Sequence, residues 1–474
     1  MNEETSPKDT TAAATDAVAV VVLPLPAQGH LNQLLHLSRL LSLRGLAVHF
    51  AGSAAHNRQA RLRAHGWDPV RQAIRFHDLP TPPFASPPPD PTNHNKFPVH
   101  LQPTFEASDA LRAPFADLLR ALALTSRRVV VVHDSLMSFA AREASLVPNA
   151  EAYAFHPVSA FACFFFQYES RGADASALFP ELPTLSTDGC FTDRFKDFIR
   201  NRHGLTASDA GRLLNTCRPI EGRFIDLFAR EPFARDKKLW AVGPLNQIEA
   251  DVKGGHARHE ILKWLDNQPP DSVMYVSFGT TSSLSDEQIS EIAVGLERSE
   301  QRFVWVLREA DRGDIFAERE DGSRRARPPD EDYKRRVRAR GLVMDGWAPQ
   351  VEILGHGSTG GFMSHCGWNS CMESLSMGVP MAAWPMHSDQ PRNAMLVTEV
   401  LGVGVGVREW GRREEVVGAE AVEEAVRRVM GEEEGRGMRR RAEEIGVMVR
   451  GAASEGGCAN AELDSFVAHI SRWA

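Results

Sequence analysis

Residues 17–53, AVAVVVLPLPAQGHLNQLLHLSRLLSLRGLAVHFAGS, decide the fold class. The apolar run AVAVVVLPLP predicts a buried strand, and after the loop AQGH the leucines of LNQLLHLSRLLSLR recur on one helical face. Gly45 predicts the end of that helix, and AVHFAGS resumes as a strand. A strand, a helix and a second strand in this order are the seed of a parallel sheet.

The second half of the chain opens in the same way. DSVMYVSFGT (271–280) is an apolar strand, a helix follows with Ser285 or Asp286 as its cap, and RFVWVLR is the next strand. The sequence therefore predicts an α/β fold of two doubly wound, Rossmann-like domains. The predicted boundaries are a disordered leader 1–16, a first domain 17–245, a linker 246–256, a second domain 257–455 and a C-terminal helix 456–474.

Composition excludes several classes of protein. The chain has 474 residues, of which 43% are apolar and 24% charged, as in soluble globular proteins. A net charge of −8 argues against a nucleic-acid surface, and the leader lacks the basic start and apolar centre of a secretory signal. The run 17–25 is shorter than the ~20 residues of a membrane span. Six cysteines without a CxxC pair predict reduced thiols, no structural zinc and a cytoplasmic location.

A second informative stretch covers residues 347–390, WAPQVEILGHGSTGGFMSHCGWNSCMESLSMGVPMAAWPMHSDQ. TGGFMS predicts a strand and GWNSCMESLSMG a helix, so SHCGWNS is a turn at the carboxyl edge of the sheet, where open α/β folds bind ligands. A helix start offers unpaired N–H groups and about half a positive charge, which suits a phosphate. His365 and Ser370 add side-chain donors there, and Gly367 permits the close approach of a ligand.

Two further side chains complete a nucleotide site. Glu373 lies one helical turn after Asn369 and can accept hydrogen bonds from a ribose diol, and Trp347 offers a flat face to a base. Taken singly, Trp347 and Trp368 fit core aromatics equally well, and His365 fits a helix cap. Their joint occurrence within one stretch favours the nucleotide site.

This stretch closely resembles, without a gap, the signature box of plant family 1 UDP-glycosyltransferases. The resemblance implies a GT-B arrangement, in which the two domains face each other across a cleft and a C-terminal helix crosses back to the first domain. It implies that Trp347 stacks on uracil, Gln350 fixes the base and Glu373 holds the ribose. The other donor-site residues that it implies are His365, Asn369 and Ser370 with Thr280, Thr281 and Ser282 for the diphosphate, Asp389 and Gln390 for the sugar, and Ala348 and Trp368 as further members of the box.

The resemblance also bears on the donor. In the family a terminal Gln in the box is associated with glucose, so UDP-glucose is the expected co-substrate, with xylose left open. A monomer is the usual state of the family. The resemblance implies a transfer that needs no metal, so no metal and no cofactor are expected.

Sugar transfer to a hydroxyl needs a base, and the first domain offers His30 after its first strand. VVVVHDS predicts a strand that ends in His133 and Asp134 at the same sheet edge, so Asp134 is the expected partner of His30. A helix-cap role is the alternative for either residue. The resemblance, carried by the PAQGH turn and the later Asp, implies an inverting, metal-independent transfer with His30 as general base and Asp134 stabilising the imidazolium.

The small-molecule acceptor is expected to contact loops of the first domain. The candidates are Phe84 in a proline-rich loop, Phe155 and His156 in the aromatic run 153–166, and His387 in the MHSDQ tail. Core packing is the alternative for residues 161–166. The mixed-charge tract 308–336 predicts a long solvated loop.

Segments 29–67 and 131–143 and the MHSDQ ending resemble zeatin O-glucosyltransferases, which cap the side-chain hydroxyl of a cytokinin with glucose. The sequence does not separate cis- from trans-zeatin, whose shapes differ little, and cis-zeatin is preferred. A broad phenolic or flavonoid O-glucosyltransferase is the rival function. A non-catalytic UDP-sugar-binding protein is the rival of another class, and loss of His30 or Asp134 would have favoured it.

Overall fold

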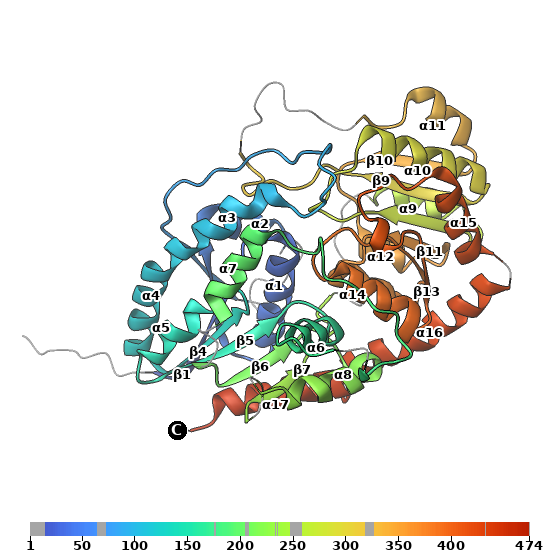
Figure 1. The fold of residues 1–474 in the computed structure, drawn as a ribbon. Coiled ribbons are helices and arrows are strands. Elements are labelled where there is room, and N and C mark those ends of the chain that lie inside the picture. The colour runs from blue at the N-terminus through green and yellow to red at the C-terminus, as the bar shows by residue number, and fades with distance from the viewer. Residues whose placement is uncertain are drawn as a thin grey trace, which may run out of the picture.

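The computed structural model describes residues 15–63, 73–174, 177–203, 208–232, 234, 236–246, 258–317, 327–431 and 433–473. Within them the chain forms two parallel sheets, each with helices on both faces (Figure 1). The predicted leader 1–16 and linker 246–256 lie outside the described residues, apart from Thr15, Asp16 and Asn246. The prediction of an α/β fold with two Rossmann-like halves is confirmed.

The first sheet contains seven strands in the order β3-β2-β1-β4-β5-β6-β7. They are β1 (Thr15–Leu23), β2 (Ala47–Ser53), β3 (Ile74–Leu79), β4 (Ser126–Asp134), β5 (Ala150–His156), β6 (Gly211–Leu214) and β7 (Lys238–Ala241). The helices of this half are α1 (Gln28–Leu43), α2 (Ala54–Arg63), α3 (Gln102–Ala107), α4 (Arg112–Thr125), α5 (Phe139–Ser145), α6 (Ala160–Glu169), α7 (Asp193–His203) and α8 (Arg218–Arg230). Successive residues of β1 face opposite sides, so Val20 packs with Leu34 of α1 and Val21 with Phe115 of α4.

The second sheet contains six strands in the order β10-β9-β8-β11-β12-β13. They are β8 (Val273–Ser277), β9 (Arg302–Leu307), β10 (Gly341–Asp345), β11 (Thr359–Ser364), β12 (Met381–Ala383) and β13 (Gly404–Gly406). Its helices are α9 (Glu260–Leu265), α10 (Asp286–Ser299), α11 (Glu331–Val337), α12 (Gln350–Leu354), α13 (Trp368–Met377), α14 (Gln390–Met395), α15 (Ala419–Met430) and α16 (Glu434–Ala453). Ser285 is the cap of α10, because its side chain accepts a hydrogen bond from the Gln288 amide.

Part of the mixed-charge tract folds, which corrects the prediction of a long loop over 308–336. Residues Glu331–Val337 form α11, because the Asp330 side chain caps the helix by accepting from the Tyr333 amide, and Tyr333 and Val337 are buried. No helix among the described parts of the chain is long and apolar enough to cross a membrane.

The last helix, α17 (Cys458–Ser471), packs against the first sheet although it follows the second in the chain (Figure 1). Leu463, Phe466 and Ile470 are buried in the same core as Val20. The Phe466 ring meets the Tyr153 ring edge-on at a centroid distance of 5.1 Å. The apolar stripe of the C-terminal helix therefore completes the core of the first half.

A shared hydrophobic core also joins the two halves. It combines residues of α6 and α8 from the first half with residues of α13 and α14 from the second. Trp368, the first residue of α13, is buried in this core, and its indole N–H donates to the Asn215 carbonyl oxygen at 2.7 Å. Trp368 therefore holds α13 against the first half.

Replacing Trp368 with Phe is expected to lower the free energy of unfolding by about 1–3 kcal/mol, because the buried Asn215 carbonyl loses its donor. Urea unfolding followed by circular dichroism measures the change. Trp473→Phe is the matched control, since Trp473 is 72% exposed. Equal stability of the two variants would contradict an anchoring role for Trp368.

In each sheet the strand order reverses beside the strand that comes first in the chain. The reversal lies between β1 and β4 in the first sheet and between β8 and β11 in the second. At such a point the connections leave in opposite directions and open a crevice at the carboxyl ends of the strands. Leu23 lies beside His133 in the first sheet, and Ser277 lies beside Ser364 in the second. The residues that follow these strand ends form the candidate site.

Candidate active site

The structure brings His30 and Asp134 together. Asp134 is the last residue of β4, and its Oδ2 lies 2.6 Å from Nδ1 of His30. His30 lies in the first turn of α1 rather than in a loop, because α1 already begins at Gln28 and the His30 amide bonds to the Ala27 carbonyl. The Asp134 carboxylate is fully buried and also accepts from the Leu136 amide at 2.9 Å, which fixes its orientation.

The environment of His30 raises the pKa of its imidazole ring. Burial alone lowers the pKa of an imidazole, but the charge and hydrogen bond of Asp134, with a smaller contribution from Asp389, raise the pKa of His30 above its usual value. Asp134 occupies Nδ1, so Nε2 is the nitrogen left for a substrate, and the His30 side chain is 24% exposed. The pair has the geometry of a general base with an orienting carboxylate.

A second buried pair stands directly behind this one, and sequence reasoning did not find it. His133 Nε2 lies 2.9 Å from Oδ1 of Asp209, and both side chains are fully buried. The other ring nitrogen of His133 lies 2.8 Å from the Asp134 carbonyl oxygen. The end of β4 is thereby held in place. Asp209 precedes β6 in sequence, and no local motif marks it as a partner of His133.

The turn before α13 is built around the His365 imidazole. Gly367 is the N-cap of α13, and a Cβ on Gly367 or on Gly279 would lie 2.5 Å from the His365 ring. Both positions therefore require glycine. Burial lowers the pKa of His365 to about 4, so the ring is neutral at pH 7. Its Nδ1 is buried and has no hydrogen-bond partner among the described residues.

Gln350, Ser370 and Glu373 form one hydrogen-bonded group on neighbouring turns of α12 and α13. The Gln350 side-chain amide donates to Glu373 Oε2 at 2.7 Å and to Ser370 Oγ at 3.0 Å. The Tyr275 hydroxyl donates to Gln350 Oε1 at 3.3 Å. Burial raises the pKa of Glu373 to about 7, which is the signature of a carboxylate that lacks a full set of donors.

Trp347 and Ala348 stand at the start of the same box but in different surroundings. The Trp347 side chain is 55% exposed, with its ring edge-on to His259 at 6.1 Å. Such an exposed flat ring is available for stacking. Ala348 instead packs against the shared core between the halves.

The tail of the box forms a tight, buried turn. Gln390 Oε1 accepts from the amides of Met386 and His387 at 2.9 and 3.0 Å, and Asp389 Oδ2 accepts from the Asn393 side chain at 2.7 Å. Burial raises the pKa of Asp389. The Gln390 carbonyl oxygen therefore shapes the turn, and its amide nitrogen lies 3.2 Å from Nε2 of His387.

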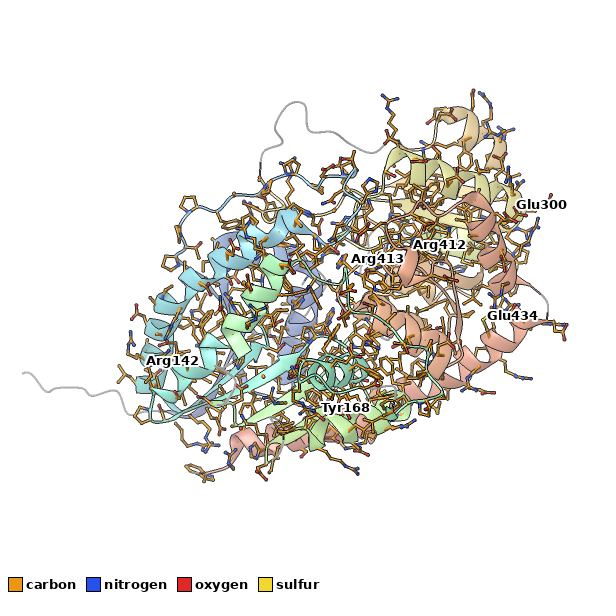
Figure 2. The ribbon with its side chains drawn as sticks, viewed as in Figure 1. Arg142, Tyr168, Glu300, Arg412, Arg413 and Glu434 are labelled. Atoms are coloured by element: carbon orange, nitrogen blue, oxygen red, sulfur yellow. The ribbon has the colours of Figure 1, made fainter. Side chains whose placement is uncertain are left out.

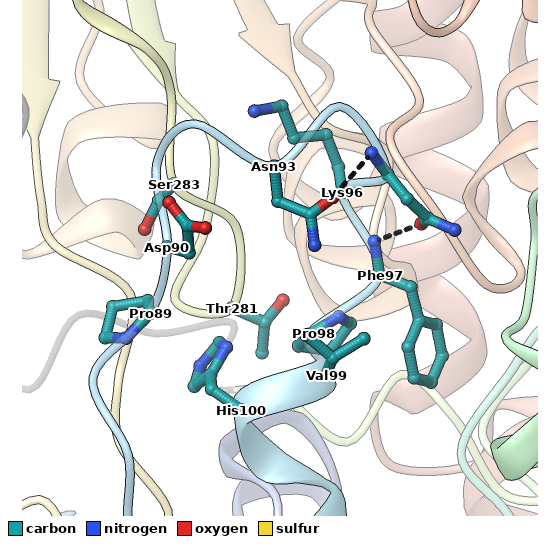
Figure 3. A pocket seen from close by; sticks show the side chains of 11 residues that line it. Pro89, Asp90, Asn93, Lys96, Phe97, Pro98, Val99, His100, Thr281 and Ser283 are labelled. Carbon is teal, nitrogen blue, oxygen red and sulfur yellow. Dashed lines mark hydrogen bonds between the residues drawn. The ribbon is translucent and has the colours of Figure 1, made fainter.

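The segment after β8 faces this tail. Thr281 Oγ1 lies 3.3 Å from His387 Nε2, the Thr280 carbonyl accepts from the Asp311 amide at 2.7 Å, and the Ser282 hydroxyl is buried without a partner among the described residues. Figure 3 shows the side chains around a small hollow between Thr281 and the segment 89–100. That hollow lies beside the tail rather than at the His30–Asp134 pair.

The acceptor candidates are dispersed. Phe155 has no exposed surface and belongs to the core beside α1, so the prediction that it contacts an acceptor is wrong for this structure. The His156 ring lies 3.2 Å from the Arg212 guanidinium and packs against Phe228. Phe84 stacks on the His56 ring at 5.7 Å. His387 lies in the donor tail as described, edge-on to Phe97 at 5.9 Å.

Sequence reasoning also missed the polar contacts that join the two halves at this site. The Asn369 side-chain amide donates to the Gly29 carbonyl at 2.9 Å, next to His30. The Ser159 hydroxyl donates to Asn393 Oδ1 at 2.7 Å, and the Asn393 amide donates to the Cys366 carbonyl. These partners are distant in sequence, and no motif pairs them. They place the His30–Asp134 pair beside the start of α13.

Comparison with known proteins agrees with this geometry. Residues 16–247 match the family model described as glycosyltransferase, N-terminal domain, and residues 249–436 match the model described as UDP-glucoronosyl and UDP-glucosyl transferase. The predicted resemblance is thereby confirmed.

Full-length relatives are similar over nearly the whole chain. Zeatin O-glucosyltransferase of Phaseolus lunatus is 48% identical over 100% of both chains. Zeatin O-xylosyltransferase of Phaseolus vulgaris is 47% identical over 96% of this chain and 98% of its own, and cis-zeatin O-glucosyltransferase 1 of Zea mays is 47% identical over 96% and 99%. A transferase from Siraitia grosvenorii, solved in complex with UDP, has a TM-score of 0.76 and 30% identity over 96% of this chain and 100% of that chain.

Proposed function

Because the chain belongs to the plant family 1 UDP-glycosyltransferases, we propose that it transfers glucose from UDP-glucose to the side-chain hydroxyl of zeatin. Similarity to enzymes named for zeatin supports the acceptor. The Asn369–Gly29 hydrogen bond is the observation that carries the proposal, because it sets a histidine base beside a helix start suited to a diphosphate.

The reaction proceeds in one step. His30 Nε2 takes the proton of the zeatin hydroxyl while the hydroxyl oxygen forms a bond to C1 of glucose. The bond between C1 and the diphosphate oxygen breaks, and UDP leaves with the electron pair. Attack on the face opposite the leaving group inverts C1. Asp134, hydrogen-bonded to Nδ1, stabilises the imidazolium that forms.

The leaving diphosphate gains negative charge, and donors at the start of α13 are assigned to it. They are the free amides after Gly367 and the side chains of His365, Asn369 and Ser370, together with the hydroxyls of Thr280, Thr281 and Ser282 after β8. Fixed donors of this kind stabilise developing charge without reorganisation. The proposal uses no metal and no cofactor.

The donor sugar is assigned to Asp389 and Gln390, and glucose is preferred to xylose. Relatives of nearly equal identity are named for either sugar, so the choice rests on few contacts. The Gln390 amide and the Asp389 carboxylate are the polar groups that the tail of the box directs to the sugar.

A release assay tests the proposal. UDP release from UDP-glucose is measured separately with cis-zeatin, trans-zeatin, dihydrozeatin and a flavonol, and each is repeated with UDP-xylose. Strong turnover with a zeatin and UDP-glucose, with cis-zeatin fastest, is the expected result. Preference for the flavonol would overturn the cytokinin acceptor, and preference for UDP-xylose would overturn the donor. UDP-glucose hydrolysis without transfer to any acceptor would overturn the transferase function.

Glu373→Gln is expected to raise the KM for the UDP-sugar by about tenfold or more with a smaller change in kcat. The amide replaces a carboxylate acceptor of ribose hydroxyls, and binding of this part of the donor is the same in the ground and transition states. Initial rates against donor concentration measure the effect. Glu352→Gln, an exposed position on α12, is the control. A fall in kcat alone would contradict a ribose-binding role.

A further inference from the structure

A cavity of about 220 Å³ lies outside the donor site, where the two halves meet. Its walls come from the loop before Phe97 in the first half and from the start of α10, the end of β12 and the turn after β13 in the second. Its lining includes Lys96, Leu284, Trp384, Met386, Arg408 and Arg413. The space is large enough for several waters or for one small ion with its solvent.

Three cations converge on this cavity, and none of them forms an ion pair with a carboxylate in the described parts of the chain. Lys96 Nζ donates to the Pro91 carbonyl at 3.3 Å, and the Arg408 guanidinium donates to the Pro385 carbonyl at 2.8 Å. The Arg413 guanidinium donates to the Trp410 carbonyl at 3.5 Å and lies over the Trp410 ring, 5.4 Å from its centroid. The Nε atoms of Arg408 and Arg413 are buried and have no partner among the described residues.

The arrangement is electrostatically unfavourable when the cavity holds only water. Burial, together with the charge of Arg413, lowers the pKa of Arg408 to about 10. Burial and the charge of Arg408 lower the pKa of Lys96 to about 8, and Asp90 offsets only part of this. Cations that repel one another in a partly desolvated site are costly unless an anion joins them.

The acidic residues of the lining do not neutralise these cations. Glu287, Glu414 and Glu415 are exposed, and Glu415 is bound by Arg412 through two hydrogen bonds. Figure 2 shows Arg412 and Arg413 as neighbours on the same turn, at the junction of the two halves. The cations thus lie in the cavity and the carboxylates at its rim.

We propose that this cavity is a second binding site, for a dianion of the phosphate class, with Lys96, Arg408 and Arg413 as its ligands. Arginine and lysine together satisfy the oxygens of a phosphate through charge-assisted hydrogen bonds. Because Lys96 belongs to the first half and the arginines to the second, a bound phosphate would hold the halves together. Free phosphate and the phosphate of a small ester share this chemistry.

An anion bound in the cavity should also affect the donor site. Phe97, the residue after Lys96, packs against His387 in the donor tail, and His387 contacts Thr281. An anion that immobilises Lys96 should therefore lower the KM for the donor. This kinetic consequence rests on the proposed function, whereas the binding itself does not.

Calorimetric titration of inorganic phosphate into the full chain, at constant ionic strength maintained with NaCl, tests the site. Saturable binding is expected, weakened about tenfold or more in Lys96→Gln and in Arg413→Gln. Arg338→Gln is the matched control, because it removes the same charge from an exposed position outside the cavity lining and should bind phosphate as the parent does. Equal weakening in Arg338→Gln, or no saturable binding by the parent, would overturn the proposal.

Two further titrations show which kind of phosphate binds and whether it binds in this cavity or in the donor site. Glycerol phosphate in place of phosphate shows whether an ester is accepted: tighter binding than phosphate assigns the site to a phosphoester, and weaker binding assigns it to the free ion. A titration with saturating UDP present separates this cavity from the donor site. Phosphate binding that UDP abolishes and that Lys96→Gln leaves unchanged would place the ion at the diphosphate site and overturn the proposal. No acceptor or turnover is needed, so failure of the transferase assay leaves this test intact.

Discussion

Replacing His30 with Ala is expected to lower kcat for sugar transfer by about 10²–10⁴-fold, because the acceptor hydroxyl then has no base. UDP affinity, measured by calorimetry, should change little, since the nucleotide is assigned to α12 and α13. The Asp134 carboxylate, however, is fully buried and loses its partner, so Ala also risks the fold. Thermal unfolding of the variant measures that risk.

His30→Gln separates the two effects. Its side-chain amide can still donate to Asp134 but cannot accept a proton at neutral pH. It should keep the stability and UDP binding of the parent and lose transfer as completely as His30→Ala. Transfer at the parent rate in either variant would contradict the role of His30 as the base.

Replacing Asp134 with Asn is expected to lower kcat/KM by about 10²–10⁴-fold and to shift its pH profile. In the parent, Asp134 raises the pKa of His30, so activity should rise with pH as the ring loses its proton and level off above that raised pKa. Without the carboxylate, burial dominates and the pKa of His30 falls. The rising limb of the kcat/KM profile should therefore move to lower pH while its plateau falls.

Measurement of kcat/KM across pH reports these protonation states in the free enzyme. Asp197→Asn is the control, since Asp197 lies exposed on α7 in an ion pair with Arg200 and should leave the profile unchanged. An Asp134→Asn profile whose rising limb stays in place would show that His30 is not the group that titrates.

The sequence predicted those residues of the candidate site that lie at or just after the ends of strands. Asp134 ends β4 and His30 follows the neighbouring parallel strand β1, so the sequence alone predicted that both lie at one edge of the sheet. The structure places their side chains 2.6 Å apart. The group of Gln350, Ser370 and Glu373 lies within one short stretch of chain. Local order therefore sufficed for these residues.

Contacts made through tertiary packing were not predictable. Phe155 stands in an aromatic run, and only its position in β5 shows that it points into the core. Asp209 pairs with His133, and Asn369 donates to Gly29, although the partners lie far apart in the chain. No spacing or periodicity encodes such partners, because the relative placement of the helices decides them. The helix Glu331–Val337 was not predicted, because most of its residues are charged and only Tyr333 and Val337 are buried.

Because α17 completes the core of the first half, its origin matters when related enzymes are recombined. A chimera that joins residues 17–245 of one parent to the remainder of another inherits its last helix from the wrong parent. Leu463, Phe466 and Ile470 would then meet a foreign surface around Val20, Tyr153 and Trp240. Exchanges of the first half between related enzymes should therefore transplant 458–471 with it, as one unit of two segments.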